Sequence, residues 1–430
     1  MVSAPRQIAV RLLRDAELPG DFLEHRLERD RFVQELRPED RRLVQELLFG
    51  VVRWRATLDW MIHQRTEGRP QLPLTMTLLR LAFYQLFWLD RVPAYAVLND
   101  SVEMARRTGG EGLGKFINAV LRGATRDREA IGQAFDALQQ SDPATAWSHP
   151  AWLVKRWQEL FGAAATRRLL EWDNTPPETY VRLNPRRLSM EKLIELWRDE
   201  RVEYDFKGYD WTTENLVCQL GAHPPLARLR SFVRGGYYVQ DPSTLLAVRE
   251  LAPKAGETIL DYCAAPGGKS TFIAQLMEDK GIITAHDPSI ERLRLVRENA
   301  SRLGLSSVFP TNVAPSPMRE RGRYDRVLVD APCSNTGVLR RRLEARWRLR
   351  EEEIPRLAAQ QLRTLLEVAD LLKAGGRLVY STCSLEPEEN RAVVDRFIAQ
   401  RPNFSFVRDR QLSPLKEKVD GAYVAVLQKN

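Results

Sequence analysis

Apolar residues repeat at intervals of three and four along the first third of the chain. This spacing places them on one face of a helix and predicts amphipathic helices. It occurs in residues 8–16, 40–64, 74–89, 94–107 and 114–126. Gly68, Pro70 and Pro73 interrupt the helical pattern at one boundary between these stretches, and the glycines between 109 and 114 interrupt it at another. Residues 1–140 are therefore expected to form a compact all-α bundle, a fold that more often binds than catalyses.

The pattern becomes mixed over residues 141–236. Helix-like spacing occurs in 149–162 and 190–200, and strand-like runs occur in 179–184 and 231–239. This mixture predicts a small α+β connector. Because it is rich in arginine and tryptophan, RNA contact is one interpretation, and ordinary core packing of the tryptophans is the other.

Over residues 237–430, short apolar runs alternate with amphipathic helical stretches. The expected strands are 257–263, 281–287, 324–333, 375–383 and 422–429. Alternation of this kind predicts a Rossmann-like, doubly wound parallel sheet, in which ligands bind where the strands end. All the candidate functional residues below lie at the carboxyl ends of these strands.

Composition narrows the class of protein. A chain of 430 residues should contain two or three domains, and a hydrophobic fraction of 43% is typical of globular proteins. No run approaches the ~18 apolar residues of a membrane helix, and charges interrupt the N-terminal stretch where a signal peptide needs an apolar core. A cytoplasmic protein is expected. The net charge of +8 slightly favours a polyanionic partner.

The chain has four cysteines, Cys218, Cys263, Cys333 and Cys383, and no pair has CxxC spacing. Neither a metal site nor a disulfide is therefore expected. Cys218, in ENLVCQL, is interpreted as a small buried hydrophobic residue.

One strand end carries a glycine loop, in LDYCAAPGGKS. Gly267 and Gly268 allow a ligand to approach the backbone, and the next strand end places Asp287 where it could accept hydrogen bonds from ribose hydroxyls. The loop lacks the first glycine of a phosphate-binding P-loop and does not match GxGxxG. An adenosine ligand without a phosphate, S-adenosylmethionine, fits what remains; the alternative is a simple tight turn.

Two further strand ends each carry a cysteine, in DAPCSNTG and YSTCSLEPEEN. Methylation of a pyrimidine at carbon-5 requires a nucleophile at carbon-6, for which a thiolate is suited, and a base that later removes the carbon-5 proton. Asp330 could hydrogen-bond or protonate ring nitrogen 3. This chemistry does not decide which cysteine attacks carbon-6. The alternative to a catalytic pair is that the two cysteines are buried at these strand ends by coincidence.

The motifs CAAPGGK, DAPCSNTG and TCSLEPEEN resemble those of the RNA 5-methylcytosine methyltransferases. The N-terminal LVQELLFGVVRWRATLDWMI, RVPAYAVLNDSVEMA and FINAVLRG resemble the NusB-like RNA-binding bundle of the bacterial RsmB (Sun/Fmu) branch. HPAWLVKRW, RLNPRR and VQDPSTLLAV are similar to the connector of that branch. The likeness extends over the whole chain, and its motifs are long and ordered.

The resemblance implies roles for individual residues. Cys383 is the nucleophile, Cys333 is needed for product release, and Asp330 lies between the cofactor and the base. Asp287 holds the cofactor ribose, and Lys269 reaches the reaction centre. The residues expected to wrap the methionine part of the cofactor are Cys263, Ala264, Ala265, Pro266, Gly267, Gly268 and Lys269.

The sequence departs from the family pattern at two places. An acidic residue usually lies near the adenine, whereas this chain reads PTNVAPS, so that Asn312, or alternatively Thr311, takes the position. The usual RRHPD after the first cysteine reads RRRLEAR. Arg340, Arg341 and Arg342 are candidates for phosphate contacts, with a solvated charged turn as the alternative.

These inferences predict a monomeric enzyme that methylates carbon-5 of a cytosine in 16S ribosomal RNA, with no DNA or membrane partner. Two alternatives stay open. Transfer RNA could be the substrate, although several transfer RNA members of the family lack the NusB-like domain. The chain could also be an RNA-binding assembly factor whose catalytic site has decayed.

Overall fold

The computed structural model describes residues 3–16 and 23–430. The chain divides into two compact units, and each is described separately below. Unit 1 comprises Met1–Thr175 and Leu339–Arg348, and unit 2 comprises Pro176–Val338 and Leu349–Asn430. The domain limits expected from the sequence, at residues 140 and 236, stay a prediction.

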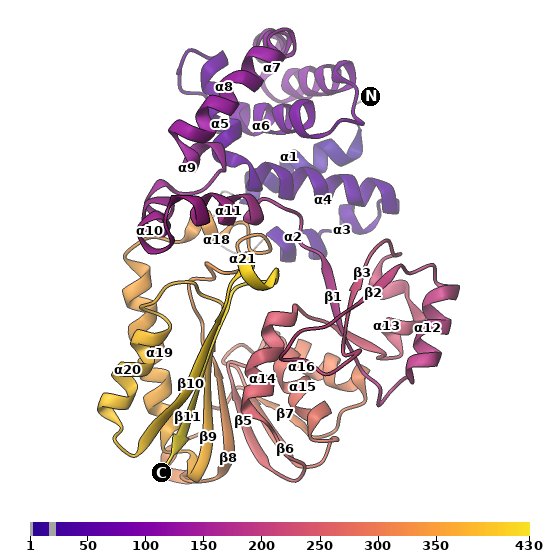
Figure 1. Ribbon diagram of the computed structural model, residues 1–430. Helices are drawn as coiled ribbons and strands as arrows, with labels where there is room; N and C mark the ends of the chain where they lie inside the picture. Colours follow the sequence, from indigo (N-terminus) through magenta and orange to yellow (C-terminus); the bar gives the residue numbers. More distant parts are fainter. Residues whose placement is uncertain (1–2, 17–22) are drawn as a thin grey trace. The chain divides into compact units, whose positions relative to one another are not determined.

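Unit 1 is all-α in its described part (Figure 1). Its helices are α1 (Ala4–Ala16), α2 (Leu23–Arg29), α3 (Arg31–Gln34), α4 (Pro38–Arg53), α5 (Arg55–Arg65), α6 (Pro73–Trp88), α7 (Ala94–Arg126), α8 (Arg128–Ser141), α9 (Pro143–Ala146), α10 (Ala151–Phe161), α11 (Ala163–Asp173) and α18 (Ala345–Arg348). Helix α6 is apolar on nearly all sides and is accordingly buried between its neighbours. The predicted helical bundle is confirmed.

The glycines between 109 and 114 interrupt the helical region, as the sequence suggested. Helix α7 spans them, but Gly110 leaves the helical conformation, with φ of 81° and ψ of −178°. The segment therefore consists of two helical stretches that meet at a kink at Gly110.

Residues 339–348 of unit 1 follow directly on the DAPCSNTG loop in the sequence. Arg346 anchors them and is 0% exposed. Its guanidinium donates to Asn174 Oδ1 at 2.9 Å, to the Asp173 carbonyl at 3.0 Å and to the Ser148 carbonyl at 3.1 Å. Trp347 Nε1 also donates to the Val52 carbonyl at 3.0 Å. The short segment is therefore fixed by buried hydrogen bonds to helical parts of unit 1.

Unit 2 begins with a small antiparallel sheet of order β2-β3-β1-β4. Its elements are β1 (Thr179–Leu183), α12 (Met190–Asp199), β2 (Tyr204–Lys207), β3 (Val217–Leu220), the 3₁₀ turn Leu226–Arg228, α13 (Arg230–Val233) and β4 (Tyr237–Val239). The predicted strand 231–239 is wrong in its first part. Gly235, at φ of 75°, turns the chain so that Arg230–Val233 is helical and only the end of the segment is a strand.

The remainder of unit 2 contains a seven-stranded sheet of order β10-β11-β9-β8-β5-β6-β7 (Figure 1). Its strands are β5 (Thr258–Tyr262), β6 (Ile282–His286), β7 (Val308–Thr311), β8 (Tyr324–Asp330), β9 (Leu372–Thr382), β10 (Phe404–Leu412) and β11 (Ala422–Lys429). Strands β5 to β9 pair in parallel, which confirms the Rossmann-like prediction. The last strand, however, is antiparallel to both of its neighbours, so the sheet is mixed.

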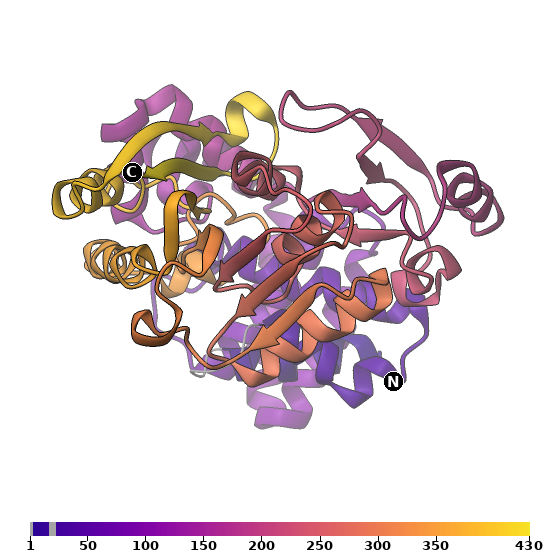
Figure 2. The same ribbon diagram turned by 90° about the horizontal axis from the view of Figure 1, so that it is seen from below.

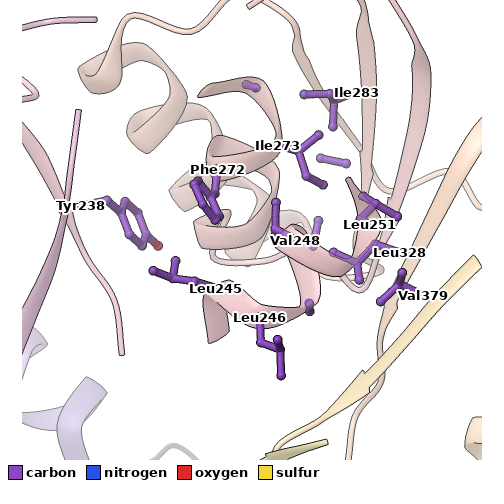
Figure 3. Close-up of a cluster of buried hydrophobic side chains, with 14 of the residues drawn as sticks. Tyr238, Leu245, Leu246, Val248, Leu251, Phe272, Ile273, Ile283, Leu328 and Val379 are labelled. Carbon is purple, nitrogen blue, oxygen red and sulfur yellow. The ribbon is translucent and has the colours of Figure 1, made fainter. Parts of the chain in front are cut away.

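Helices cover both faces of this sheet (Figures 1 and 2). They are α14 (Leu245–Leu251), α15 (Gly268–Leu276), α16 (Ile290–Leu303), α19 (Glu353–Ala369) and α20 (Arg391–Gln400), with short α17 (Pro317–Glu320) and α21 (Pro414–Glu417) in connections. Along β8, Leu328 packs toward α14 and α15 (Figure 3), whereas Val327 and Val329 pack toward α19 and α20. The strand is buried on both faces, as its continuous apolar sequence requires.

Within the described ranges, no helix combines the length and the apolar character needed to cross a membrane. Cys218 is completely buried in the core of the small sheet, as expected for a hydrophobic residue.

Candidate active site

The predicted site residues lie at the carboxyl ends of neighbouring parallel strands. The predicted cofactor loop, Cys263–Lys269, follows β5, Asp287 follows β6, Asp330 ends β8, and Cys383 follows β9. The order of connection reverses between β5 and β8, which is where doubly wound sheets open a crevice for ligands.

The loop after β5 is folded back on itself. Cys263 and Gly267 both have left-handed backbones, with φ of 68° and 102°. The Gly267 N–H donates to the Ala264 carbonyl at 2.8 Å, and the Ala264 N–H donates to the His286 carbonyl of β6 at 2.8 Å. A side chain at Gly267 would be strained by its φ and would meet Val296 at 3.2 Å. The bare glycine keeps the loop tight and its backbone open to a ligand.

Asp287 is buried and linked to the loop. Its Oδ2 accepts from the Ala265 N–H at 3.3 Å and pairs with Arg292 at 3.1 Å. Its Oδ1 accepts from the Ser289 N–H at 3.0 Å. The neighbouring strand ends at Thr311, whose carbonyl accepts from the Asp287 N–H at 3.2 Å. Asn312 follows and is exposed.

Two exposed apolar side chains lie just beyond these strand ends. Ile290, which follows β6, is 63% exposed, and Val313, which follows β7, is 64% exposed. A carboxylate followed closely by exposed apolar side chains suits a nucleoside. The ribose hydroxyls need hydrogen-bond acceptors, and the faces of the base pack against apolar groups. The residues present therefore fit S-adenosylmethionine.

The small sheet of unit 2 supports the start of α15 through a buried arginine. Arg182 of β1 is 1% exposed and donates to the Gly268 carbonyl at 2.9 Å and to Thr271 Oγ1 at 3.0 Å. Its guanidinium also lies 4.8 Å from the centre of the Phe272 ring. This arrangement fixes the first turn of the helix that follows the cofactor loop.

Asp261 of β5 is fully buried under the loop. Its Oδ2 accepts from Ser270 Oγ at 2.5 Å, and its Oδ1 has no hydrogen-bond partner among the described residues. Burial raises the pKa of this carboxyl to about 7, although the hydrogen bond from Ser270 by itself lowers that pKa. Because the folded pKa exceeds the unfolded one, the folded state retains a proton between about pH 4 and pH 7 that the unfolded state loses.

The free energy of unfolding of the cofactor-free protein should therefore contain a contribution that falls as the pH rises from 4 to 7. Asp261→Asn keeps the shape of the side chain and stays neutral. We therefore expect the free energy of unfolding of this variant to change less between pH 4 and pH 7 than that of the wild type, by a few kcal/mol at most. Urea unfolding at several pH values measures the difference. Parallel curves for the two proteins would contradict the assignment.

Lys269 and Asp330 form a partly buried ion pair. Lys269 Nζ lies 2.7 Å from Asp330 Oδ2, and Ser381 Oγ donates to Asp330 Oδ1 at 2.7 Å. Burial by itself lowers the pKa of Lys269, but the charge and hydrogen bond of Asp330, together with Asp261 and Cys383, outweigh it and raise that pKa. An ammonium group fixed by Asp330 therefore interacts electrostatically with Cys383.

The sulfurs of Cys333 and Cys383 lie 3.2 Å apart. The Cys383 thiol also lies 3.2 Å from Asn335 Oδ1, whose amide nitrogen donates to the Cys333 carbonyl at 2.8 Å. The hydrogen bond with Cys383, burial and neighbouring negative charge raise the pKa of Cys333 well above its ordinary value. The two thiols are therefore in unequal environments, with Cys333 held in its protonated form.

Of the three arginines proposed for phosphate contacts, Arg340 is not available at the surface. It is 1% exposed, and its guanidinium lies 4.0 Å from the centre of the Trp172 ring. A guanidinium over a tryptophan ring makes a favourable cation–π contact. Arg342 is exposed and lies 3.4 Å from Glu24.

Sequence reasoning missed Asp261, Arg182, Ile290 and Val313. Asp261 directly precedes the glycine loop, and Ile290 and Val313 follow strand ends, so their positions gave a usable signal. Arg182 gave none, because its contacts come from residues far away in the sequence.

The mixed sheet and its strand-end loop are those of an S-adenosylmethionine-dependent methyltransferase. Family models match the chain in three places: the 16S rRNA methyltransferase RsmB/F over residues 248–428, the NusB family over 3–126, and a ferredoxin-like domain of the RsmF/B-like methyltransferases over 149–209.

Individual proteins agree with these models. The probable ribosomal RNA small subunit methyltransferase B of Bacillus subtilis is 35% identical over 92% of each chain. The ribosomal RNA small subunit methyltransferase B of Vibrio cholerae is 35% identical over 92% of this chain and 91% of its own. A crystal structure of a methyltransferase homolog protein from Pyrococcus horikoshii is 28% identical, with a TM-score of 0.58 over 67% of this chain and 98% of its own.

The chain belongs to the 16S rRNA methyltransferase RsmB/F family. The resemblance, the NusB-like bundle and the cofactor predicted from the sequence are confirmed.

Proposed function

We propose that the protein transfers the methyl group of S-adenosylmethionine to carbon-5 of a cytosine in small-subunit ribosomal RNA, through a covalent bond between Cys383 and carbon-6. The observation that carries the proposal is the 3.2 Å separation of two thiols beside the Lys269–Asp330 ion pair. The names of the relatives support the substrate. The chemistry of the two thiols supports the position on the base.

Cys383 is the nucleophile in this proposal. It interacts with the ammonium of Lys269, and the thiol of Cys333 can donate a hydrogen bond to it. Attack on carbon-6 directs electron density to carbon-5. As the sulfur of Cys383 bonds to carbon-6, its S–H bond breaks and that proton balances the one gained at ring nitrogen 3. Asp330, held by Lys269 and Ser381, is the group assigned to this nitrogen.

Cys333 acts after methyl transfer. Its own thiol proton first passes to water, and the resulting thiolate, a strong base because the pKa of Cys333 is raised, then takes the carbon-5 proton. The bond between Cys383 and carbon-6 can then break and release the product. Bound S-adenosylmethionine supplies the methyl group as an electrophile, with the loop Cys263–Lys269 and Asp287 as its proposed holders and Thr311 or Asn312 beside the adenine.

The RNA is proposed to bind through its backbone and one unstacked base. A net charge of +8 favours a polyanion, and the bundle is similar to the NusB family. A cytosine inside a helix must leave its stack to meet both thiols, which costs a few kcal/mol. An unpaired cytosine is therefore the expected target.

The reaction is tested with methyl-labelled S-adenosylmethionine and unmodified 16S ribosomal RNA. We expect the label in 5-methylcytidine after digestion to nucleosides. Transfer RNA and double-stranded DNA serve as parallel substrates. Label confined to transfer RNA, or found in another nucleoside, would show that the proposed substrate or position is wrong. No uptake of the cofactor in calorimetry would favour the decayed assembly factor.

A second experiment tests for the covalent adduct between the protein and the RNA. Cys333→Ala should form a covalent protein–RNA complex that survives a denaturing gel, because the base that permits release is missing while the nucleophile is intact. If this variant turns over like the wild type without trapping, Cys333 has no part in release.

A further inference from the structure

A buried carboxylate joins the two loops that carry the cysteines. Glu389 lies in the PEEN sequence just before α20 and is 0% exposed. The mechanism proposed above does not use it. A glutamate with no exposure requires either an ion pair or a full set of hydrogen bonds.

Four donors surround this carboxylate. Oε1 accepts from the Ser334 N–H and from Gln361 Nε2, each at 2.9 Å. Oε2 accepts from the hydroxyls of Ser334 and Ser384, the latter at 2.6 Å. Ser334 directly follows Cys333, and Ser384 directly follows Cys383. One group therefore holds the residue next to each thiol.

The surroundings hold Glu389 itself in place. The Tyr380 hydroxyl donates to its carbonyl at 2.5 Å, and Gln361 donates also to the Pro332 carbonyl at 3.0 Å. Ser334, Ser384 and Gln361 are each at most 3% exposed. Hydrogen bonds to a charged acceptor away from water are stronger than those at a surface. The network is therefore a rigid link between the ends of β8 and β9.

We propose that Glu389 is a positioning residue that sets the distance between the Cys333 and Cys383 sulfurs. An ionised carboxylate accepts all four hydrogen bonds and donates none, so both loops depend on the same group. Without it, buried donors of Ser334 and Ser384 would lose their partner, and the two loops would be left with their direct contacts, such as the bond from the Gly337 N–H to the Cys383 carbonyl at 2.9 Å. The catalytic part of this inference rests on the two-thiol chemistry proposed above.

The charge of Glu389 also distinguishes the two thiols. Glu389 acts on Cys333, where it adds to the hydrogen bond with Cys383 and to burial in raising the pKa of that thiol. Lys269 interacts instead with Cys383. A carboxylate on one side and an ammonium on the other keep the proton on Cys333.

The first test measures the thiol separation without RNA or cofactor, so it can fail independently of the proposed function. Diamide accepts two electrons and two protons as two adjacent thiols become a disulfide. We expect rapid formation of a Cys333–Cys383 disulfide in the wild type, mapped by mass spectrometry, and a rate about tenfold lower in Glu389→Gln. An unchanged rate, or no disulfide in the wild type, would overturn the proposal.

The second test measures catalysis. Glu389→Gln should lower kcat for RNA methylation by about 10²-fold while KM for S-adenosylmethionine stays within about twofold, because the cofactor loop is untouched. A proportional rise in that KM would instead indicate a general loss of structure. Ser384→Ala removes one donor and should slow disulfide formation in the same direction, so it replaces the glutamine variant should that one not fold.

Two controls separate positioning from stability. Asp395→Asn changes a carboxylate on α20 that pairs with Arg391 at the surface, 2.7 Å away, and should leave both readouts unchanged. Phe397→Leu creates a cavity in the core beneath the same helix and should lower the melting temperature while retaining the wild-type oxidation rate. If it slows oxidation as much as Glu389→Gln, the role of Glu389 is merely structural.

Discussion

Replacing Cys383 with alanine is expected to reduce RNA methylation by about 10⁴-fold or more, since it removes the sulfur proposed to form the bond to carbon-6. The variant should still bind S-adenosylmethionine with wild-type affinity, because the cofactor loop and Asp287 belong to other strand ends. Methyl transfer from labelled cofactor measures the first result and calorimetry the second.

The matched control is Cys218→Ala, which removes a buried thiol from the small sheet of unit 2 and should retain activity. The double variant Cys333→Ala, Cys383→Ala should not trap RNA. Substantial methylation by Cys383→Ala, or trapping by the double variant, would exclude Cys383 as the nucleophile.

Arg346→Ala is expected to destabilise unit 1 by about 3–5 kcal/mol, the usual consequence of deleting one partner of a buried charged network. The change leaves Asn174 Oδ1 and the carbonyls of Ser148 and Asp173 without their donor, in a place with no exposure to water. Burial lowers the pKa of this guanidinium to about 10, and it therefore stays charged near neutral pH. Urea unfolding followed by tryptophan fluorescence measures the loss.

Arg342→Ala in the same segment provides the comparison. Arg342 is exposed and forms a surface ion pair with Glu24 at 3.4 Å, so its removal should change the free energy of unfolding by less than about 0.5 kcal/mol. Equal effects of the two variants would show that the buried hydrogen bonds of Arg346 do not stabilise the unit.

The parts of the fold with a strong local pattern could be predicted from the sequence. Strands β5, β6, β8 and β9 are apolar runs between turns, and their alternation with helices determined the fold class. Strands β7 and β10 were missed for a physical reason. β7 is a short edge strand that contains Pro310, and β10 is an edge strand with charged residues at 408–410.

Only those site residues that lie at the ends of predicted strands could be identified from the sequence. Cys333, Cys383, Asp330 and Lys269 could be recognised because they follow apolar strands in distinctive motifs. Glu389 lies in the motif TCSLEPEEN, but its burial and its role could not be predicted, because they arise from contacts such as that with Ser334, 55 residues away in the chain. Arg340 was misjudged for the same reason.

The ten residues 339–348 also determine how the protein can be divided for study. Leu339, Leu343 and Ala345 are buried in unit 1, yet they are encoded in the middle of the methyltransferase sequence. A truncated chain that begins at Pro176 would carry this stretch without the helices that cover it, leaving apolar side chains and Arg346 unpaired. Recombinant work on the isolated catalytic half therefore requires redesign of this stretch, or co-expression of residues 1–175 as a separate polypeptide.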